Sequence, residues 1–358
     1  MFVPSPYQGE VLVPQSQFAK SEPRIYFFDN LKAILITLVV FGHVIEPMLE
    51  EQAATIAYAF IYLFHMPLFI FCSGFFAKYT PKKIFTRLVI PYIIFQLIYT
   101  FLARGIWDDT DRLIQFTTPY WILWYLLALM VWTLLLPLLD ILISNKRNMI
   151  LTIIASLILG VAAGFEYTMG YYMSLSRLVV FAPFFIIGRC IGKTVSPETF
   201  QRRISAWYIK CVTGILSALI FVWLFFNYDT LDVRWFYGAL AYVRLDYTYI
   251  VRILNYLAAF VISLFFLSII PRRKMFFSYI GQRTMAVFLL HGIVMRLMVH
   301  YDVYTALYEE TRGTEAWMLF ASFLFSILLV VLFSLNFKRL VPFRRKTSKE
   351  KLNCTSAA

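Results

Sequence analysis

Charged residues are scarce in this chain of 358 amino acids, where Asp, Glu, Lys and Arg together make up only 15%. Soluble domains carry about 25% charged and about 45–50% apolar residues. Here 61% of the residues are hydrophobic and the mean hydropathy is +0.72. The shortage of charge excludes an ordinary soluble domain. It predicts an all-α polytopic membrane protein, because apolar segments cross a bilayer as helices that satisfy their own backbone hydrogen bonds.

Cysteine is also scarce, with four residues at positions 72, 190, 211 and 354. The sequence has no CxxC motif and no His/Cys cluster, so it predicts neither a metal site nor a permanently bound cofactor. None of the four cysteines falls in a segment expected outside the cell, and we therefore expect no disulfide.

Two nucleotide or hydrolase motifs are missing as well. Residues Gly188 to Thr194 read GRCIGKT, but a phosphate loop has the spacing G-x-x-x-x-G-K-[ST], and Ile187 stands where its first glycine belongs. No strand is expected before this stretch, and a GxSxG nucleophile elbow is absent. The sequence thus gives no support for ATP hydrolysis or for a nucleophilic serine in a GxSxG motif.

Long apolar runs are what the chain has instead. About ten are long enough to span a bilayer, at approximately residues 26–46, 53–77, 88–104, 119–140, 149–165, 173–191, 206–226, 247–270, 281–299 and 316–336. The loops between them alternate between basic and acidic, which under the positive-inside rule places both termini in the cytoplasm. The net charge of +13 therefore reflects topology and does not predict a nucleic-acid partner.

One transmembrane domain, residues 24–340, covers nearly the whole chain. Residues 1–23 contain four prolines and lack the basic-then-apolar order of a signal peptide. We expect them to form a disordered cytoplasmic tail. Residues 341–358 are expected to form a basic cytoplasmic tail.

The first apolar run, RIYFFDNLKAILITLVVFGHVIEP, carries Asp29, Lys32, His43 and Glu46. On a helix Lys32 and His43 fall within roughly 20° of each other around the axis and ~17 Å apart along it. Measured from His43, Asp29 lies about 40° to one side and Glu46 about 60° to the other. Ionisable groups inside a bilayer usually face protein or a wet cavity. The stripe predicts an active-site wall.

Two further histidines lie within predicted spans, and each has a structural alternative. His65 precedes Pro67, whose kink would free backbone groups that an imidazole can bind. For His291, in FLLHGIV, we expect a structural hydrogen bond between helices, although it remains a candidate site residue.

Other candidates lie near the predicted membrane surfaces. Arg177 would pair with Glu166 or with a substrate. The cluster Trp121–Tyr125, which includes Trp124, is either an interfacial belt or a stacking surface for sugars. The basic segment Lys78–Arg87 is either a topology signal or an anchor for a phosphate-bearing donor.

In the first run, ten residues separate Lys32 from His43. Together with five further stretches, this spacing resembles the acyltransferase 3 family of bacterial integral membrane proteins. The stretches are FHMPLFIFCSGFF, KKIFTRLVIPY, PYWILWYLLAL, FAPFFIIGRCIG and IGQRTMAVFLLHG. The chain is most similar to the branch of fucose 4-O-acetylase-like acetyltransferases, over about residues 24–340. Many relatives carry R-x-x-R before the third span. Here Ile84 stands three residues before Arg87, and Lys83 is the nearest basic residue.

The resemblance implies a multi-pass enzyme of the bacterial plasma membrane. It implies transfer of an acyl group, commonly acetyl, from a cytoplasmic donor such as acetyl-CoA to a hydroxyl of an extracytoplasmic or lipid-linked carbohydrate. Lys83 and Arg87 would bind the donor, Lys32 would bind donor phosphate or balance developing charge, and membrane lipid would surround the protein. His43 would act as general base toward the hydroxyl, because imidazole accepts protons near neutral pH. Asp29 or Glu46 would orient the ring or stabilise its charged form.

Two alternatives stay open at this point. Intramembrane charges also suit an exporter of a polysaccharide or lipid-linked sugar, although paired interrupted segments typical of inverted repeats are missing from the sequence. A channel or purely structural membrane protein would leave the polar stripe of the first run unexplained.

Overall fold

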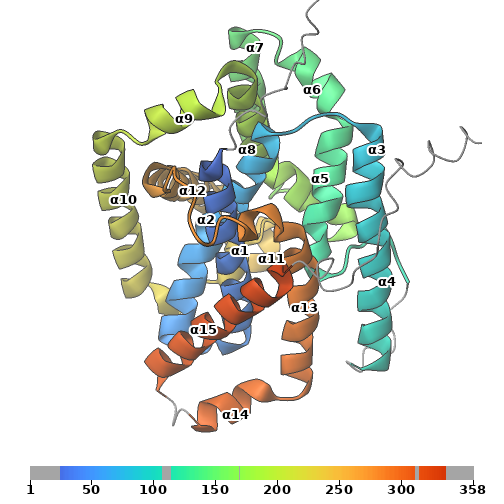
Figure 1. The fold of residues 1–358 in the computed structure, drawn as a ribbon, viewed down its shortest axis with the longest axis vertical. Helices are drawn as coiled ribbons and strands as arrows, with labels where there is room; N and C mark the ends of the chain where they lie inside the picture. Colours follow the sequence, from blue (N-terminus) through green and yellow to red (C-terminus); the bar gives the residue numbers. More distant parts are fainter. Residues whose placement is uncertain (1–24, 107–113, 169, 311–313, 336–358) are drawn as a thin grey trace, which may run out of the picture.

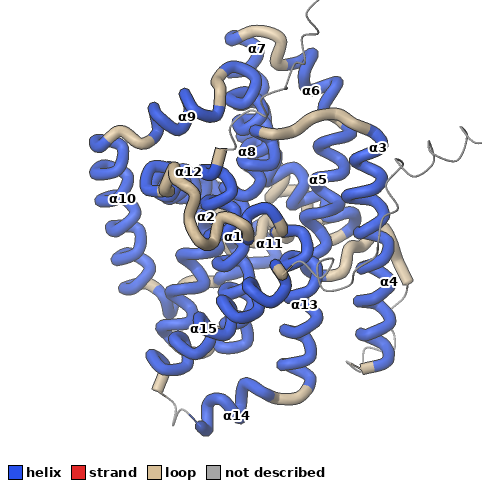
Figure 2. Tube along the Cα trace, in the orientation of Figure 1, coloured by secondary structure: helices blue, strands red, loops and turns tan. Residues whose placement is uncertain are grey.

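The computed structural model describes residues 25–106, 114–168, 170–310 and 314–335, which form a bundle of helices (Figure 1). Over these ranges the chain contains no β-strand (Figure 2). The predicted all-α fold is confirmed. The predicted tails, residues 1–23 and 341–358, lie outside the described residues, as does Cys354, while Cys72, Cys190 and Cys211 are free.

Seven helical segments of the described chain are long and apolar enough to cross a membrane. They are α1 (Tyr26–Ile45) with the 3₁₀ turn Glu46–Met48, α2 (Gln52–Phe75), α3 (Pro81–Ile84) continuing through a π turn (Phe85–Val89) into α4 (Ile90–Gly105), α8 (Leu175–Thr194) after the 3₁₀ turn Tyr172–Ser174, α10 (Trp207–Phe226), α12 (Tyr249–Ile269) and α15 (Glu315–Ser334). An eighth span is formed if the 3₁₀ turn Trp121–Leu123 and α5 (Trp124–Leu134) are joined to α6 (Leu136–Leu142), with a bend of 56°.

Two of the ten predicted spans correspond to helices of 17 residues, α7 (Lys146–Ala162) and α13 (Thr284–His300). At 1.5 Å per residue each is about 26 Å long, slightly less than a typical hydrocarbon core. By length and composition the described residues thus give seven or eight spans. The count of ten and the cytoplasmic placement of both termini stay predictions.

Short helices occupy several segments that we expected to be loops: α9 (Pro197–Ile204), α11 (Tyr242–Leu245) and α14 (Val303–Glu310). In Figure 1 α9 lies at the upper end of the bundle and α14 at the lower end. The basic segment Lys78–Arg87 is also mostly helical, contrary to its prediction as a loop. Pro81 begins α3, as proline is well suited to a first helical position, where its missing N–H would have had no partner.

The centre of the bundle is α2, which packs closely against α8. A Cβ atom on Gly188 would overlap the carbonyl oxygen of Phe71, and one on Gly192 would overlap that of Phe75. Gly74 approaches the backbone of α8 in the same way. Small residues four apart allow membrane helices to approach at backbone distance. The GRCIG stretch that fails as a phosphate loop is therefore a helix-packing motif.

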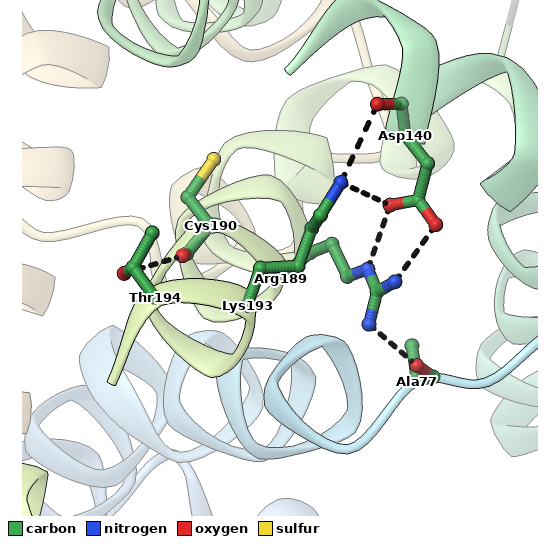
Figure 3. A network of polar contacts seen from close by, with 6 residues as sticks. All are labelled: Ala77, Asp140, Arg189, Cys190, Lys193 and Thr194. Atoms are coloured by element: carbon green, nitrogen blue, oxygen red, sulfur yellow. Dashed lines mark hydrogen bonds and ion pairs between the residues drawn. The ribbon is translucent and has the colours of Figure 1, made fainter. Parts of the chain in front are cut away.

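A charged network holds α8 to two neighbouring segments (Figure 3). Arg189 forms a two-pronged pair with Asp140 of α6, with Nε 2.9 Å from Oδ1 and Nη2 2.7 Å from Oδ2. Its Nη1 donates to the carbonyl oxygen of Ala77, just beyond α2, at 2.9 Å. Lys193 adds a longer contact to Asp140, at 3.4 Å. This network fixes α6 after the bend that separates it from α5.

Candidate active site

A cavity of about 560 Å³ lies at the end of the bundle where α1 stops and α2 starts. Its walls come from α1, α2, residues 118–124, Tyr171, α8, residues 236–237 and α13. The basic segments after α2, α8 and α12 lie one helix length away, at the other end. The loops that close the cavity are those that the charge pattern places outside the cytoplasm.

His43 lies in the last turn of α1 and lines this cavity. Its Nδ1 lies 2.8 Å from Oε2 of Glu46 and 3.1 Å from the hydroxyl of Tyr62. A carboxylate can only accept hydrogen bonds, so the pair with Glu46 assigns the proton to Nδ1 and leaves the lone pair on Nε2. Among the described residues Nε2 has no hydrogen-bond partner. The side chain is 13% exposed, which leaves it reachable but largely shielded.

Three tyrosines support the His43–Glu46 pair. The ring of Tyr58 stacks on that of Tyr62 with 3.7 Å between centroids, and its hydroxyl lies 2.6 Å from that of Tyr237. Burial raises the pKa of the Tyr237 hydroxyl above its usual value, and the nearby Glu46 carboxylate raises it further. Tyr237 therefore keeps its proton, and the cluster presents neutral hydroxyls beside the imidazole.

His65 also lines the cavity, and its Nδ1 binds the carbonyl oxygen of Ile61 at 2.7 Å. The expected backbone hydrogen bond is present, but at a different place. Pro67 lacks an N–H for the carbonyl of Leu63, the residue four positions earlier, whereas His65 contacts Ile61. This bond leaves the Nε2 of His65 as an acceptor.

His291 makes a similar bond, from Nδ1 to the carbonyl oxygen of Val287 at 2.9 Å. This bond lies within α13, so the expected bond between helices is not the one observed. Its ring centroid lies 5.4 Å from that of His43, and its Nε2 is buried without a partner in the described chain. The rings of His43 and His291 thus lie side by side, although His291 is not among the residues that line the cavity.

Trp121 and Trp124 both line the cavity, so they do not serve as an interfacial belt alone. The ring of Trp121 lies 4.6 Å from His43, between centroids, and its backbone has a positive φ of 36°. L-residues rarely adopt this region, and positions held there by their surroundings concentrate at functional sites.

Arg177 lies over the rings of Trp124 and Tyr171, at 5.1 and 5.4 Å from the centroids, and its Nε donates to the carbonyl oxygen of Tyr237. Of the two partners predicted for Arg177, Glu166 is wrong, and a substrate stays a prediction. Glu166 is exposed and accepts hydrogen bonds from Thr168, and within the described ranges Arg177 forms no ion pair.

The polar stripe of α1 is divided into two pairs. Lys32 Nζ lies 3.3 Å from Asp29 Oδ1, and neither residue is among those that line the cavity. Lys32 lies about three turns and Asp29 about four turns from His43. At their end of α1, Asn30 donates to the carbonyl oxygens of Pro271 and Arg273. The stripe is therefore not one continuous wall, although His43 and Glu46 do share the cavity as predicted.

The predicted donor-binding residues of the third span are not in the cavity either. Lys83 on α3 and Arg87 on the π turn are both exposed. They lie at the end of the bundle that carries Lys32, next to the end of α2. The structure thus separates the predicted donor residues from the predicted base.

Tyr62, Tyr237 and Arg296 are among the cavity residues that were not singled out from the sequence. The guanidinium of Arg296 lies 4.9 Å from the ring centroid of Trp121. Arg296 lies deep inside the apolar run 281–299, whose other arginine, Arg283, is near its start. A cation within an apolar run is a signal that could have identified it. Tyr237 lies in a loop without periodicity, and nothing in the sequence marks it. Throughout the described ranges no group of three His, Cys, Asp or Glu residues could hold a metal ion.

Comparison with known proteins decides the family. The chain matches the acyltransferase domain family, Acyl_transf_3, over residues 25–335. The chain belongs to this family of acyltransferases. The predicted resemblance is confirmed at that level, and the fucose 4-O-acetylase-like branch stays a prediction.

Two curated relatives of this acyltransferase are nodulation proteins NolL. The protein from Sinorhizobium fredii is 26% identical over 217 residues, which cover 52% of this chain and 55% of the relative. The protein from Mesorhizobium japonicum is 31% identical over 118 residues, which cover 27% of this chain and 32% of the relative. The matches therefore span about a third to about half of the relatives' length. No solved structure matches the chain.

Proposed function

We propose that the protein is an O-acyltransferase of the bacterial plasma membrane. It transfers an acyl group, with acetyl as the expected group, from cytoplasmic acyl-CoA to a hydroxyl of a cell-surface or lipid-linked carbohydrate. The observation that carries this proposal is the state of His43 in an aromatic cavity: Glu46 holds its Nδ1, while its Nε2 has no hydrogen-bond partner among the described residues. Membership of the acyltransferase family gives the reaction class.

The chemistry assigned to His43 is general base catalysis. Nε2 takes the proton of the acceptor hydroxyl while the oxygen attacks the thioester carbonyl carbon, and the carbon–sulfur bond then breaks. The departing thiolate takes the proton back from the imidazolium. The products are an ester and free coenzyme A. Glu46 holds the ring in the required tautomer and stabilises its cationic form, as a carboxylate does for other catalytic histidines.

Aromatic walls support a carbohydrate as the acceptor. Trp121, Trp124 and Tyr171 line the cavity with flat apolar faces, and Tyr62 and Tyr237 add hydroxyl groups. Sites of this kind bind a ring by its apolar face and orient it with a few polar contacts. A hydroxyl held against Trp121 would be close to His43.

The donor is proposed to enter from the opposite end. Lys32, Lys83 and Arg87 would bind the phosphates of acyl-CoA through charge-assisted hydrogen bonds. The acyl arm would then pass between the helices toward His43. The separation of the two sets of residues, by about three turns of α1, suits a donor and an acceptor that approach from opposite sides of the membrane.

The test is purified full-length protein in lipid, supplied with labelled acetyl-CoA and candidate sugars. We expect His43→Ala to lower transfer by at least about 100-fold, the usual contribution of a general base. His300→Ala, at the exposed end of α13, is the matched control and should retain activity. Substantial turnover by a folded His43→Ala protein would contradict the role of His43 as base.

A further inference from the structure

Arg296 is a partly buried cation that has no ion-pair partner in the described ranges. Its guanidinium lies over the rings of Trp121 and Tyr120, at 4.9 and 5.7 Å from the centroids. Its Nε is buried without a hydrogen-bond partner, and in the described ranges Arg296 takes part in no ion pair. The side chain nevertheless lines the cavity that contains His43. It therefore has a fork of N–H donors available to a ligand.

A second arginine lines the same cavity. Arg177 donates from Nε to the carbonyl oxygen of Tyr237, and its remaining donors have no hydrogen-bond partner among the described residues. The only carboxylate among the described lining residues is Glu46, which is engaged with His43. Two guanidinium groups against one carboxylate make the cavity positive. Burying an unpaired charge is costly, so an anionic group would bind favourably here.

From these contacts we infer that the carbohydrate acceptor is anionic. Its carboxylate or phosphate group docks on Arg296, with Arg177 as the second cation. This inference rests on the proposed function and names the acceptor class for the same site. Guanidinium groups bind carboxylate and phosphate through paired hydrogen bonds. Trp121 contacts both Arg296 and His43, so an anion on the arginine would place a neighbouring sugar hydroxyl near the base.

The position of Arg296 favours the acceptor over the phosphates of acyl-CoA. Arg296 lies in the last turns of α13, at the end of the bundle that contains His43 and the loops of residues 114–121 and 227–246. The basic segments expected to meet coenzyme A lie at the opposite end. If Arg296 bound donor phosphate instead, its loss would weaken coenzyme A binding and spare the sugars.

The test measures equilibrium binding by ligand-observed NMR with the full-length protein in lipid nanodiscs. The probes are methyl glucuronide and glucose 1-phosphate as anions, methyl glucoside as their neutral counterpart, and coenzyme A. We expect at least one anionic sugar to bind about tenfold or more tightly than methyl glucoside, the usual effect of a charge-assisted hydrogen bond. Whichever of the two anionic sugars binds more tightly shows whether the site prefers a carboxylate or a phosphate.

The variants then test the residue. Arg296→Gln should abolish the preference for the anion, and Arg296→Lys should keep part of it, since it retains charge without the fork. Arg244→Gln is the matched control, because Arg244 also lies over an aromatic ring, that of Tyr167, but outside the cavity lining. It should leave all affinities unchanged.

Three results would overturn the inference. The first is equal affinity of the native protein for the anionic and neutral sugars. The second is a folded Arg296→Lys protein that loses affinity equally for both kinds of sugar. The third is weakened coenzyme A binding with unchanged sugar binding. These readouts need no turnover. An Arg296-dependent preference without acyl transfer would contradict the proposed function alone, and transfer without the preference would contradict this inference alone.

Discussion

At the scale of single residues, Glu46 has the clearest consequence for the chemistry. Its carboxylate fixes Nδ1 of His43 as a donor and favours the ring when it becomes charged. We expect Glu46→Gln to lower kcat by about 10- to 100-fold with little change in KM, because the loss is specific to the step that charges the ring. Steady-state kinetics on purified protein in lipid provide the measurement.

Glu50→Gln is the control for this prediction. Glu50 is exposed and lies four residues further along the chain. It should have native kinetics. A Glu46→Gln protein with an unchanged kcat would show that the carboxylate does not assist His43.

Local spacing explains which residue pairs could be predicted from the sequence. Asp29 with Lys32, and His43 with Glu46, are each three residues apart, so one helical turn brings them together. The contact between His43 and His291 joins segments about 250 residues apart and depends on how α1 packs against α13. No local pattern carries that information, and the same holds for Tyr237.

At the scale of helices, Gly188 tests how closely α2 and α8 must approach. Gly188→Ala should destabilise the protein by about 1–3 kcal/mol, because the added Cβ meets the backbone of Phe71, which cannot rotate away. Thermal unfolding in detergent should show a lower midpoint. Gly105→Ala is the control, since a Cβ there meets nothing within 4 Å and should leave the midpoint nearly unchanged. Equal midpoints for the two variants would contradict the close-packing interpretation.

Helix ends follow from the sequence where an apolar run has clear limits. The first run was predicted at 26–46, and α1 is Tyr26–Ile45. The run at 119–140 was predicted as one span but is divided at Leu135. Pro137 lacks an N–H for the carbonyl of Thr133, so the sequence indicates an irregularity at this position. It does not tell a break from a kink, because proline can also kink a continuous helix. The 56° bend depends on packing, which includes the pair of Arg189 with Asp140.

At the scale of the whole molecule, the orientation in the membrane remains to be tested. We expect single cysteines placed in a cysteine-free background to react with a membrane-impermeant maleimide added outside intact spheroplasts at Thr168 and Thr230, but not at Ser196. The charge pattern of the loops places the first two outside and the last inside. After permeabilisation all three should react. Labelling of Ser196 in intact spheroplasts would reverse the proposed topology.

The choice between enzyme and exporter is also made at this scale. Mild alkali releases ester-linked acetate from envelope glycans, and cells with and without the protein can be compared. An acyltransferase changes the acetate released per unit of glycan. An exporter changes the amount of glycan at constant acetate content. We expect the first result, and His43→Ala cells should resemble cells that lack the protein.

Trp121 combines a strained backbone with a side chain that the proposed site needs. Its positive φ costs about 1–3 kcal/mol relative to relaxed backbone, and its indole is the surface shared by His43 and Arg296. A glycine would adopt this conformation without the backbone cost, yet it would remove the indole that contacts both the base and the cation and packs against the core. Relief of the backbone strain at this position would therefore come at the expense of both packing and activity.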